Sequence, residues 1–167
     1  MNLRVGIGYD AHAFADDRPL YLGGVRIDHP RGLAGHSDAD VLIHAVIDAL
    51  LGAAGLGNIG RLFPDTGPEF KNIRSLELLK KVSDLLVARD ARIVNIDTVV
   101  VCEAPRIGPY EERMKEALCG ALAGLPAGSI SIKGKTTEGM GFEGRGEGIS
   151  AQAVALLQLA EGVSPAE

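Results

Sequence analysis

The chain has 167 residues, 46% of them hydrophobic, which suits a single catalytic domain over residues 1–167 better than two domains. Its 17 basic and 22 acidic residues give a net charge of −5 with no basic block, which argues against nucleic-acid binding and for small partners. Two cysteines, no charged-then-apolar leader and no apolar run near the ~18 residues of a membrane span predict a cytoplasmic protein with reduced thiols and no membrane contact.

The first predicted element is a strand over residues 3–10, where apolar side chains alternate with Arg, Gly and Asp in the pattern of a half-buried strand. Asp10 and His12 then point to the same side. With His44 they would offer three N/O ligands and leave a fourth position open, the usual arrangement of a catalytic zinc site. An Asp-x-His pair alone is weak evidence, because most such pairs are ordinary surface or turn residues.

Leu20 to Ile27 follows, with two short apolar runs around a Gly-Gly pair, and is predicted to form a β-hairpin.

A helix is predicted to begin at Ser37, where Ser37 and Asp40 fit a capping box, and to end between Gly52 and Gly57. The simplest interpretation of Asp40 is therefore a cap. His36 comes just before the helix, where free N–H groups favour an anion such as phosphate. His44 alone would best be interpreted as a hydrogen-bonded core histidine, and only the Asp-x-His pair upstream favours a metal ligand.

Residues 56–70 are too rich in Gly and Pro for regular structure and too apolar for a solvated linker, so they are predicted to form an ordered binding loop. Ser75 is predicted to cap a helix, and residues 92–103 form a strand with a buried valine centre. A helix starting at Pro109, a strand over residues 129–132 and a closing apolar helix over residues 149–160 complete the chain.

Residues 133–148 combine three basic residues, two adjacent threonines and six glycines in sixteen positions. Such a loop brings backbone N–H groups and cations to an anion, and Glu138 could hold a divalent ion between phosphate oxygens. A diphosphate site and a mobile surface loop of mixed charge explain the composition equally well. The loop matches neither a nucleotide P-loop nor a dinucleotide fingerprint.

Three segments, GYDAHAF, GHSDADVLIHAVIDALLGAAGLGNIGRLFPDT and KTTEGMGFEGRGEGISAQAVALL, occur in this order over nearly the whole chain. They resemble the 2-C-methyl-D-erythritol 2,4-cyclodiphosphate synthase family of the non-mevalonate isoprenoid pathway. The resemblance implies an α/β (α+β) subunit, with a mixed β-sheet backed by helices plus a β-hairpin, and a homotrimer with active sites between subunits. It also implies a phosphorus-oxygen lyase that converts 4-diphosphocytidyl-2-C-methyl-D-erythritol 2-phosphate into the cyclic diphosphate and CMP.

By the same resemblance, Asp10, His12 and His44 would bind Zn²⁺, and Glu138 would bind a second ion, Mg²⁺ or Mn²⁺. His36, Thr136 and Glu138 would be the catalytic residues. The substrate would contact, besides Asp10, His12, His36, Thr136 and Glu138, the following residues: Ser37, Asn58, Ile59, Gly60, Phe63, Pro64, Asp65, Thr66, Gly67, Ala104, Pro105, Arg106, Ile107, Gly108, Lys135, Thr137, Phe142 and Arg145. Of these, Ala104 to Gly108 would form the cytosine pocket.

Three positions depart from the family pattern. Asn58 and Gly67 stand where Asp is common, and Lys135 stands where Thr is frequent, so these departures would change the affinity for substrate and leave the chemistry intact. Two other functions remain open from the residues themselves. One is a metal-dependent phosphohydrolase, since the HSDAD segment with a distant His also suits a site that activates water. The other is a non-catalytic trimeric module that binds metal for stability.

Overall fold

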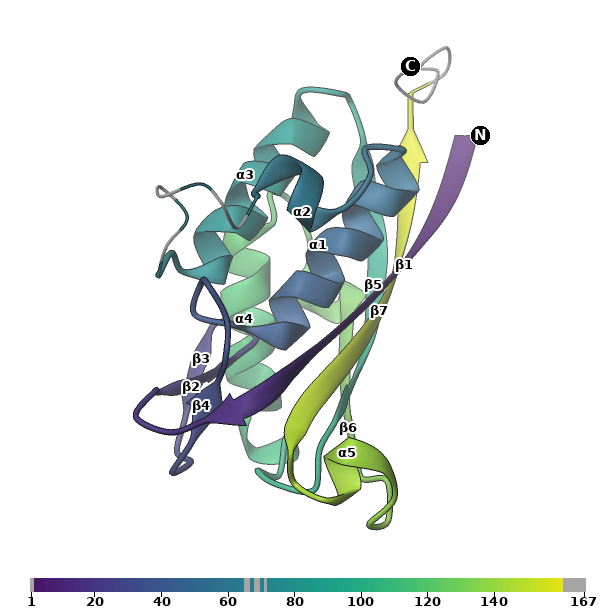
Figure 1. Ribbon diagram of the computed structural model, residues 1–167. Coiled ribbons are helices and arrows are strands. Elements are labelled where there is room, and N and C mark those ends of the chain that lie inside the picture. The colour runs from purple at the N-terminus through teal and green to yellow at the C-terminus, as the bar shows by residue number, and fades with distance from the viewer. Residues whose placement is uncertain (1, 65–66, 68–69, 71, 161–167) are drawn as a thin grey trace.

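The computed structural model describes residues 2–64, 67, 70 and 72–160, which form two layers, with helices packed on one face of a β-sheet (Figure 1). The elements are β1 (Asn2–Ala15), β2 (Leu20–Leu22), β3 (Val25–Ile27), β4 (Gly32–Leu33), α1 (Val41–Ala54), α2 (Ile59–Leu62), α3 (Ser75–Val87), β5 (Arg92–Val101), α4 (Glu111–Ala121), β6 (Ile130–Lys135), α5 (Gly141–Gly144) and β7 (Gly148–Leu159). Short 3-10 turns precede α4 and β6.

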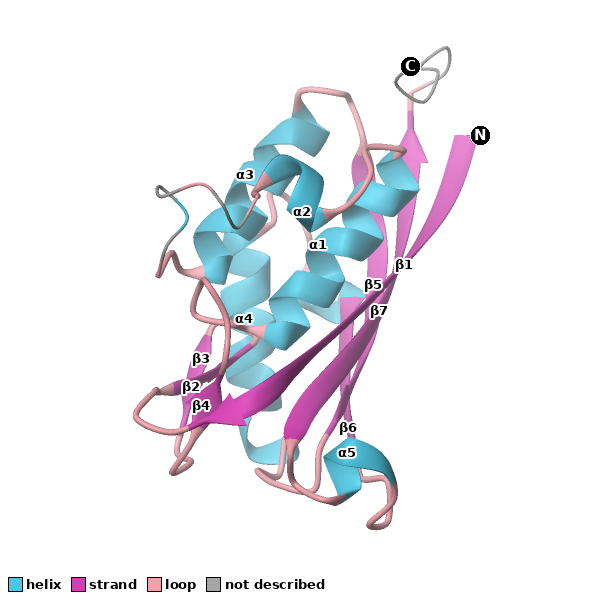
Figure 2. Ribbon diagram, viewed as in Figure 1, coloured by secondary structure: helices cyan, strands magenta, loops and turns pink. Residues whose placement is uncertain are grey.

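The main sheet has the strand order β4-β1-β7-β5-β6, and β2 pairs with β3 in a separate hairpin (Figure 2). β7 is antiparallel to both of its neighbours, β1 and β5, whereas β5 and β6 are parallel. The sheet is therefore mixed. The fold class and the hairpin predicted from the sequence are confirmed.

The helix α1 lies directly against β1, and two glycines allow this close approach. A Cβ atom added at Gly6 would lie 1.9 Å from the carbonyl oxygen of Ala49, and one at Gly8 would lie 1.9 Å from that of Ala45. Real Cβ atoms do not come within 3.0 Å of such neighbours. Glycine at these two positions therefore fixes the distance between the strand that carries Asp10 and the helix that carries His44.

α1 is the centre of the hydrophobic core, with apolar side chains such as Leu42, Ile43 and Leu50 fully buried. Its N-cap is Asp40, whose carboxylate accepts from the N–H of Ile43 and also from Gly23 and Gly24 in the hairpin turn. The interpretation of Asp40 as a cap is thus confirmed. The prediction that the helix begins at Ser37 was wrong, because Ser37 accepts from the N–H of Ala39 in the turn before the helix.

The closing segment, predicted as a helix, is the long strand β7. Its residues alternate between the helix-facing side, where Ile149, Ala153 and Leu157 are buried, and the opposite side, where Gln152 and Val154 are exposed. The alanines and leucines favour a helix locally, but hydrogen bonding to β1 on one side and β5 on the other outweighs that preference.

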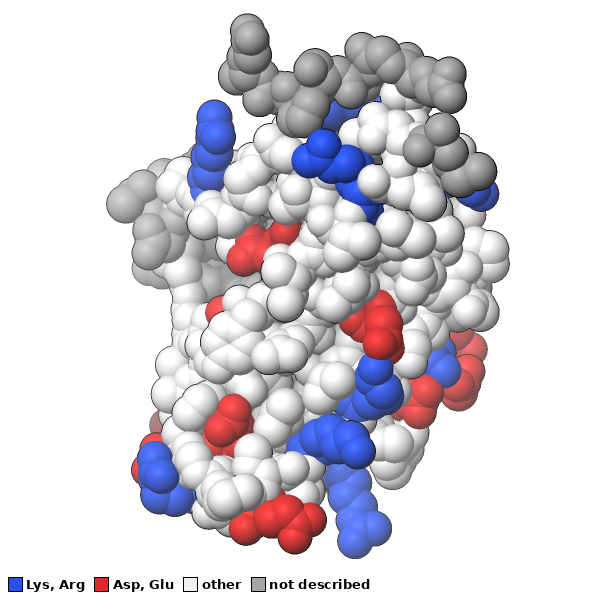
Figure 3. Space-filling view, turned by 90° about the vertical axis from the view of Figure 1, so that its right-hand side faces the viewer, with Lys and Arg blue, Asp and Glu red and all other residues white. Residues whose placement is uncertain are grey.

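Among the described residues, no element covers the outer face of the sheet, which is apolar around β1. Leu3, Val5, Ile7 and Tyr9, the alternating residues of β1, are 48%, 68%, 70% and 53% exposed, and Val154 of β7 is 43% exposed. The prediction of a half-buried strand was therefore correct. The side of β1 that faces the core carries Gly6 and Gly8, and the side with the large apolar residues faces outward. Charged side chains are sparse over much of this face and gather mainly toward its lower end (Figure 3).

Two further local predictions were wrong. The supposed loop over residues 56–70 contains the short helix α2, capped by Asn58, which accepts from the N–H of Arg61. Ser75 is the first residue of α3 and not its cap, since the N-cap is Arg74. In the part of the chain that the structure describes, no helix has both the length and the apolar character needed to cross a membrane.

Candidate active site

Asp10, His12 and His44 come together beside the N-terminal half of α1. The carboxylate oxygen Oδ2 of Asp10 lies 2.9 Å from Nε2 of His12 and 2.9 Å from Nδ1 of His44, and these two nitrogens are 3.2 Å apart. β1 places Asp10 and His12 on one side of the strand, as predicted, and α1 carries His44 across from them. Three possible ligand atoms thus form a nearly equilateral triangle.

The size of this triangle fits a zinc ion. Zinc–nitrogen and zinc–oxygen bonds of about 2.0–2.1 Å in a tetrahedron imply ligand–ligand distances of about 3.3–3.4 Å. The measured edges of 2.9 Å and 3.2 Å therefore need only a small expansion to accept the ion. Two nitrogens and one carboxylate oxygen also form a donor set that suits zinc. The three residues fit a divalent metal site with one open side.

The electrostatics of the triangle favour a charged Asp10. Burial acts to raise the pKa of Asp10, but hydrogen bonds from His12 and His44 outweigh it and hold that pKa well below its usual range. Burial acts to lower the pKa of His12, but the hydrogen bond and the charge of Asp10 raise it above the ordinary 6.5. The carboxylate is therefore ready to bind a cation, and a metal ion would replace the proton on His12.

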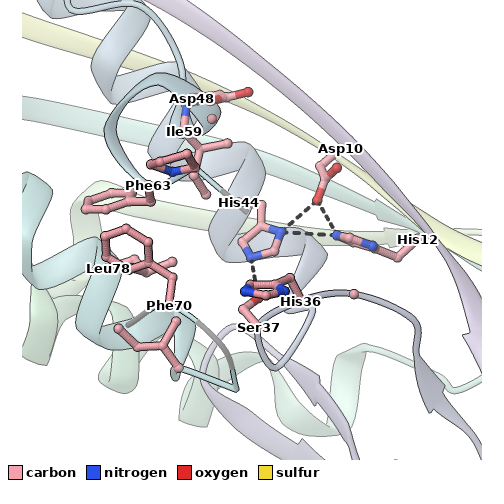
Figure 4. A pocket seen from close by; sticks show the side chains of 14 residues that line it. Asp10, His12, His36, Ser37, His44, Asp48, Ile59, Phe63, Phe70 and Leu78 are labelled. Atoms are coloured by element: carbon pink, nitrogen blue, oxygen red, sulfur yellow. Dashed lines mark hydrogen bonds and ion pairs between the residues drawn. The ribbon is translucent and has the colours of Figure 1, made fainter. Parts of the chain in front are cut away.

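A cavity of about 500 Å³ opens beside these residues (Figure 4). Of the predicted site residues, it is lined by Asp10, His12, His36, Ser37, His44, Ile59, Gly60, Phe63 and Pro64. The sequence analysis left out five lining residues, namely Gly35, Asp48, Phe70, Ile73 and Leu78. Asp48 carried a signal, because it follows His44 by one helical turn; it accepts from the N–H of Ile59, and burial raises its pKa.

A second group of predicted residues lies where β5 and β6 end. Pro105, Arg106, Ile107, Gly108, Lys135 and Thr136 line a separate cavity of about 280 Å³, together with Cys102, Glu103 and Gly134. Ala104 is exposed next to this cavity. Because β5 and β6 are parallel, their carboxyl ends meet at one edge of the sheet and bring these two segments together.

The turn that carries Thr136 to Gly139 is anchored by Glu103. One carboxylate oxygen of Glu103 accepts from the N–H of Thr137 at 3.0 Å, from the N–H of Gly139 at 3.2 Å and from the hydroxyl of Thr137 at 3.3 Å. Glu138, between these donors, has a left-handed backbone with φ 56° and is exposed. The sequence analysis missed Glu103, whose role depends on contacts across the strand ends.

The remaining predicted residues are more scattered. Phe142 is partly buried in α5, and Arg145 forms an ion pair with Glu147 at 2.8 Å. Asn58 caps α2, and the N–H of Gly67 bonds the carbonyl of Pro64. Asp65 and Thr66 lie outside the described residues. The two cavities share no lining residue among the described ones, so a single chain does not bring the predicted site residues into one place.

The family model of the YgbB family matches residues 3–158. The chain belongs to the YgbB family. A relative from Clostridium acetobutylicum, named 2-C-methyl-D-erythritol 2,4-cyclodiphosphate synthase, is 54% identical over 155 residues, 93% of this chain and 99% of that protein. A relative of the same name from Caldicellulosiruptor bescii is 56% identical over 154 residues, 92% of this chain and 98% of that one. The resemblance found in the sequence, to a family of enzymes, is confirmed.

Solved structures agree with this assignment to the YgbB family. The bifunctional IspDF from Campylobacter jejuni has a TM-score of 0.90 at 41% identity, covering 95% of this chain and 43% of that longer one. A 2C-methyl-D-erythritol-2,4-cyclodiphosphate synthase in a CDP-bound form has a TM-score of 0.84 at 39% identity, covering 93% of this chain and all of that one. The IspF CDP complex from Plasmodium falciparum has a TM-score of 0.83 at 31% identity, covering 96% and 98%.

Proposed function

We propose that the chain is a phosphorus-oxygen lyase that converts 4-diphosphocytidyl-2-C-methyl-D-erythritol 2-phosphate into 2-C-methyl-D-erythritol 2,4-cyclodiphosphate and CMP. The family assignment supports this activity. The observation that carries it is the triangle of Asp10, His12 and His44 at the wall of a cavity that also contains His36. A phosphate oxygen can approach the open side of such a site.

In this reaction an oxygen of the 2-phosphate bonds to the β-phosphorus while the bond from that phosphorus to the bridging oxygen breaks, and CMP leaves. No protein nucleophile is needed, because phosphoryl transfer depends on positioning and on neutralising charge. Zinc bound by Asp10, His12 and His44 would polarise a phosphate oxygen as a Lewis acid. His36 and Ser37, in the same cavity wall, would donate hydrogen bonds to the phosphate.

Glu138 would bind the second ion, Mg²⁺ or Mn²⁺, at the diphosphate. Its turn is held by Glu103, and its exposed carboxylate is free to meet a hard cation. Thr136, next in that turn and in the wall of the smaller cavity, would donate to the phosphate oxygens. Lys135, Phe142 and Arg145 would line the phosphate end.

The smaller cavity would hold the cytosine. Ala104 to Gly108 form a proline-stiffened segment whose backbone groups can hydrogen-bond the edge of a pyrimidine. In the larger cavity, Ile59, Gly60, Phe63 and Pro64 would contact the erythritol and ribose. The same contacts are proposed for Asn58, Asp65, Thr66 and Gly67. Two of the solved relatives carry CDP, which supports a cytidine nucleotide as the ligand.

The active form would be a homotrimer. The exposed face around Val5, Ile7 and Val154 is the kind of contiguous apolar surface that soluble monomers rarely leave uncovered. Packing three copies through these faces would also let the larger cavity of one subunit meet the smaller cavity of its neighbour, which one chain cannot achieve alone. Each subunit would be one catalytic domain. The two unpaired cysteines, Cys102 and Cys119, support a reducing cytoplasmic location.

Product analysis tests this function. Purified protein with zinc and magnesium should turn the cytidine substrate into cyclic diphosphate and CMP in equal amounts. An open-chain product would instead indicate a phosphohydrolase, and metal binding without turnover would indicate a binding module.

The His44→Ala variant tests the metal site separately. It should keep its circular dichroism spectrum and lose stoichiometric zinc, because α1 retains its apolar contacts. His29→Ala is the matched control, since His29 stacks on Phe14 and lies outside the cavity wall, and it should keep its zinc. Full zinc retention by folded His44→Ala would remove His44 from the site.

A further inference from the structure

The two nitrogens of the His44 ring have different surroundings. Nδ1 faces the oxygen of Asp10 at 2.9 Å, on the side where a metal would bind. Nε2 faces two hydroxyl groups instead, that of Ser75 at 3.0 Å and that of Ser37 at 3.2 Å. A neutral imidazole carries one hydrogen: the carboxylate of Asp10 attracts it to Nδ1 when no metal is bound, and a metal on Nδ1 leaves it on Nε2, where the two hydroxyls lie.

The hydroxyl of Ser75 has a single hydrogen, which Asp38 accepts. The Ser75 hydroxyl donates to Oδ1 of Asp38 at 2.5 Å. The other carboxylate oxygen of Asp38 accepts from the Nε of Arg74 at 3.0 Å and from the N–H of Ser75 at 3.1 Å. Asp38 is thus an ion-paired, acceptor-only group with a side chain only 6% exposed. Ser75 therefore presents only lone pairs to His44.

We propose that Ser75 and Asp38 are positioning residues: when Nδ1 of His44 binds zinc, Ser75 accepts the hydrogen on Nε2 and so holds the ring in the orientation that zinc needs. With the hydrogen on Nδ1, as the carboxylate of Asp10 favours without zinc, the lone pair of Nε2 faces a lone pair of Ser75 at 3.0 Å, and zinc binding at Nδ1 relieves this repulsion. Ser37, whose hydroxyl accepts from Ala39, could donate to Nε2 and favour that competing form. Ser75 opposes it.

The position of Ser75 makes this role specific. Ser75 is the first residue of α3, fully buried, and both its hydroxyl and its N–H donate to Asp38 instead of serving the end of the helix. His44 contacts the hydroxyl of Ser75, and this hydroxyl contacts the carboxylate of Asp38. Such partners beyond the ligands generally orient a metal-binding histidine. Loss of such a partner typically lowers metal affinity by about 10- to 100-fold.

Ser75→Ala tests the proposal, with Ser83→Ala as the matched control. Ser83 is a buried serine of the same helix, and its hydroxyl accepts from the N–H of Ala123, far along the helix from His44. Zinc dissociation constants are measured by competition with a chelator. Ser75→Ala should bind zinc about 10- to 100-fold more weakly, and Ser83→Ala should bind it as the unaltered chain does.

A second measurement needs no activity. The hydrogen on Nε2 of zinc-bound His44 is followed by ¹H–¹⁵N NMR, in which a hydrogen bond shifts the ¹H resonance downfield and slows its exchange with water. In the zinc-loaded, unaltered chain this resonance should be downfield and slow to exchange, and in zinc-loaded Ser75→Ala it should shift upfield and exchange faster. An Nε2 hydrogen that is the same in the two chains would overturn the proposal.

The inference rests on the proposed zinc site, and the two can fail separately. If the unaltered chain binds zinc and Ser75→Ala binds it equally tightly, the role of Ser75 is wrong and the zinc site remains. If the unaltered chain binds no zinc, the metal site is wrong, and the proposed effect on affinity falls with it.

Discussion

The substitution Gly8→Ala should damage both the fold and the metal site, because Gly8 sets the contact between β1 and α1. The added Cβ would lie 1.9 Å from the carbonyl oxygen of Ala45, whereas real Cβ atoms keep at least 3.0 Å from such atoms. The obstacle is helix backbone, which cannot rotate away, so β1 and α1 must separate locally by about 1 Å. Such overpacking typically lowers the free energy of unfolding by 1–3 kcal/mol, and we expect about 3 kcal/mol here.

The same displacement moves Asp10, two residues along β1, away from His44. Ligand distances in metal sites are defined to about ±0.2 Å, so a shift of about 1 Å should lower zinc affinity by more than about tenfold. Urea unfolding of the zinc-free chain gives the stability change, and chelator competition gives the affinity change. Gly120→Ala is the control. No heavy atom lies within 4 Å of a Cβ at that helical position, so stability should rise by about 1 kcal/mol and zinc binding should not change. Gly8→Ala with normal stability and zinc affinity would refute the tight strand–helix contact.

Three other outcomes are expected. Folding raises the pKa of His12 above 6.5, so protonated His12 stabilises the folded chain fully below pH 6.5, and this stabilisation is lost as the pH rises through the pKa of the folded state. The melting temperature of the zinc-free chain should therefore be lower at about pH 8 than at about pH 6. Asp10→Asn should remove most of this difference. Glu138→Gln should lower kcat about 100-fold, on the order of 3 kcal/mol, and leave CMP binding nearly unchanged; a raised KM with normal kcat would contradict the role of Glu138. Val5→Asp, at a position 68% exposed, should convert the proposed trimer to monomers in sedimentation with little loss of subunit stability, and an unchanged mass would place the interface elsewhere.

Local sequence rules predicted the elements whose signals are local. The alternation of β1, the Gly-Gly hairpin turn and the Asp40 cap each depend on residues a few positions apart, and the structure contains all three. The pair Asp10 and His12 also follows from the period of a strand, since residues two apart share a side. These features need no knowledge of what packs against them.

The same rules were wrong where distant contacts decide the outcome. An alanine- and leucine-rich segment such as β7 has a helical preference of only fractions of a kcal/mol per residue, which pairing with strands on both sides overrides. The face of β1 that enters the core was also not readable locally. Glycine leaves no side chain to bury, so only the approach of α1 shows that the glycine side is the inner one.

The sequence by itself determined the family, the mixed fold class and the three side chains of the candidate metal site, because these depend on residue identity and spacing along the chain. Only the tertiary structure showed that Asp10, His12 and His44 converge to about 3 Å, that the other predicted residues divide between two cavities, and that Ser75, Asp38 and Glu103 support them. These are hydrogen bonds and packing contacts between residues about 30 or more positions apart. Their geometry is set by the meeting of helix and sheet, which no local pattern encodes.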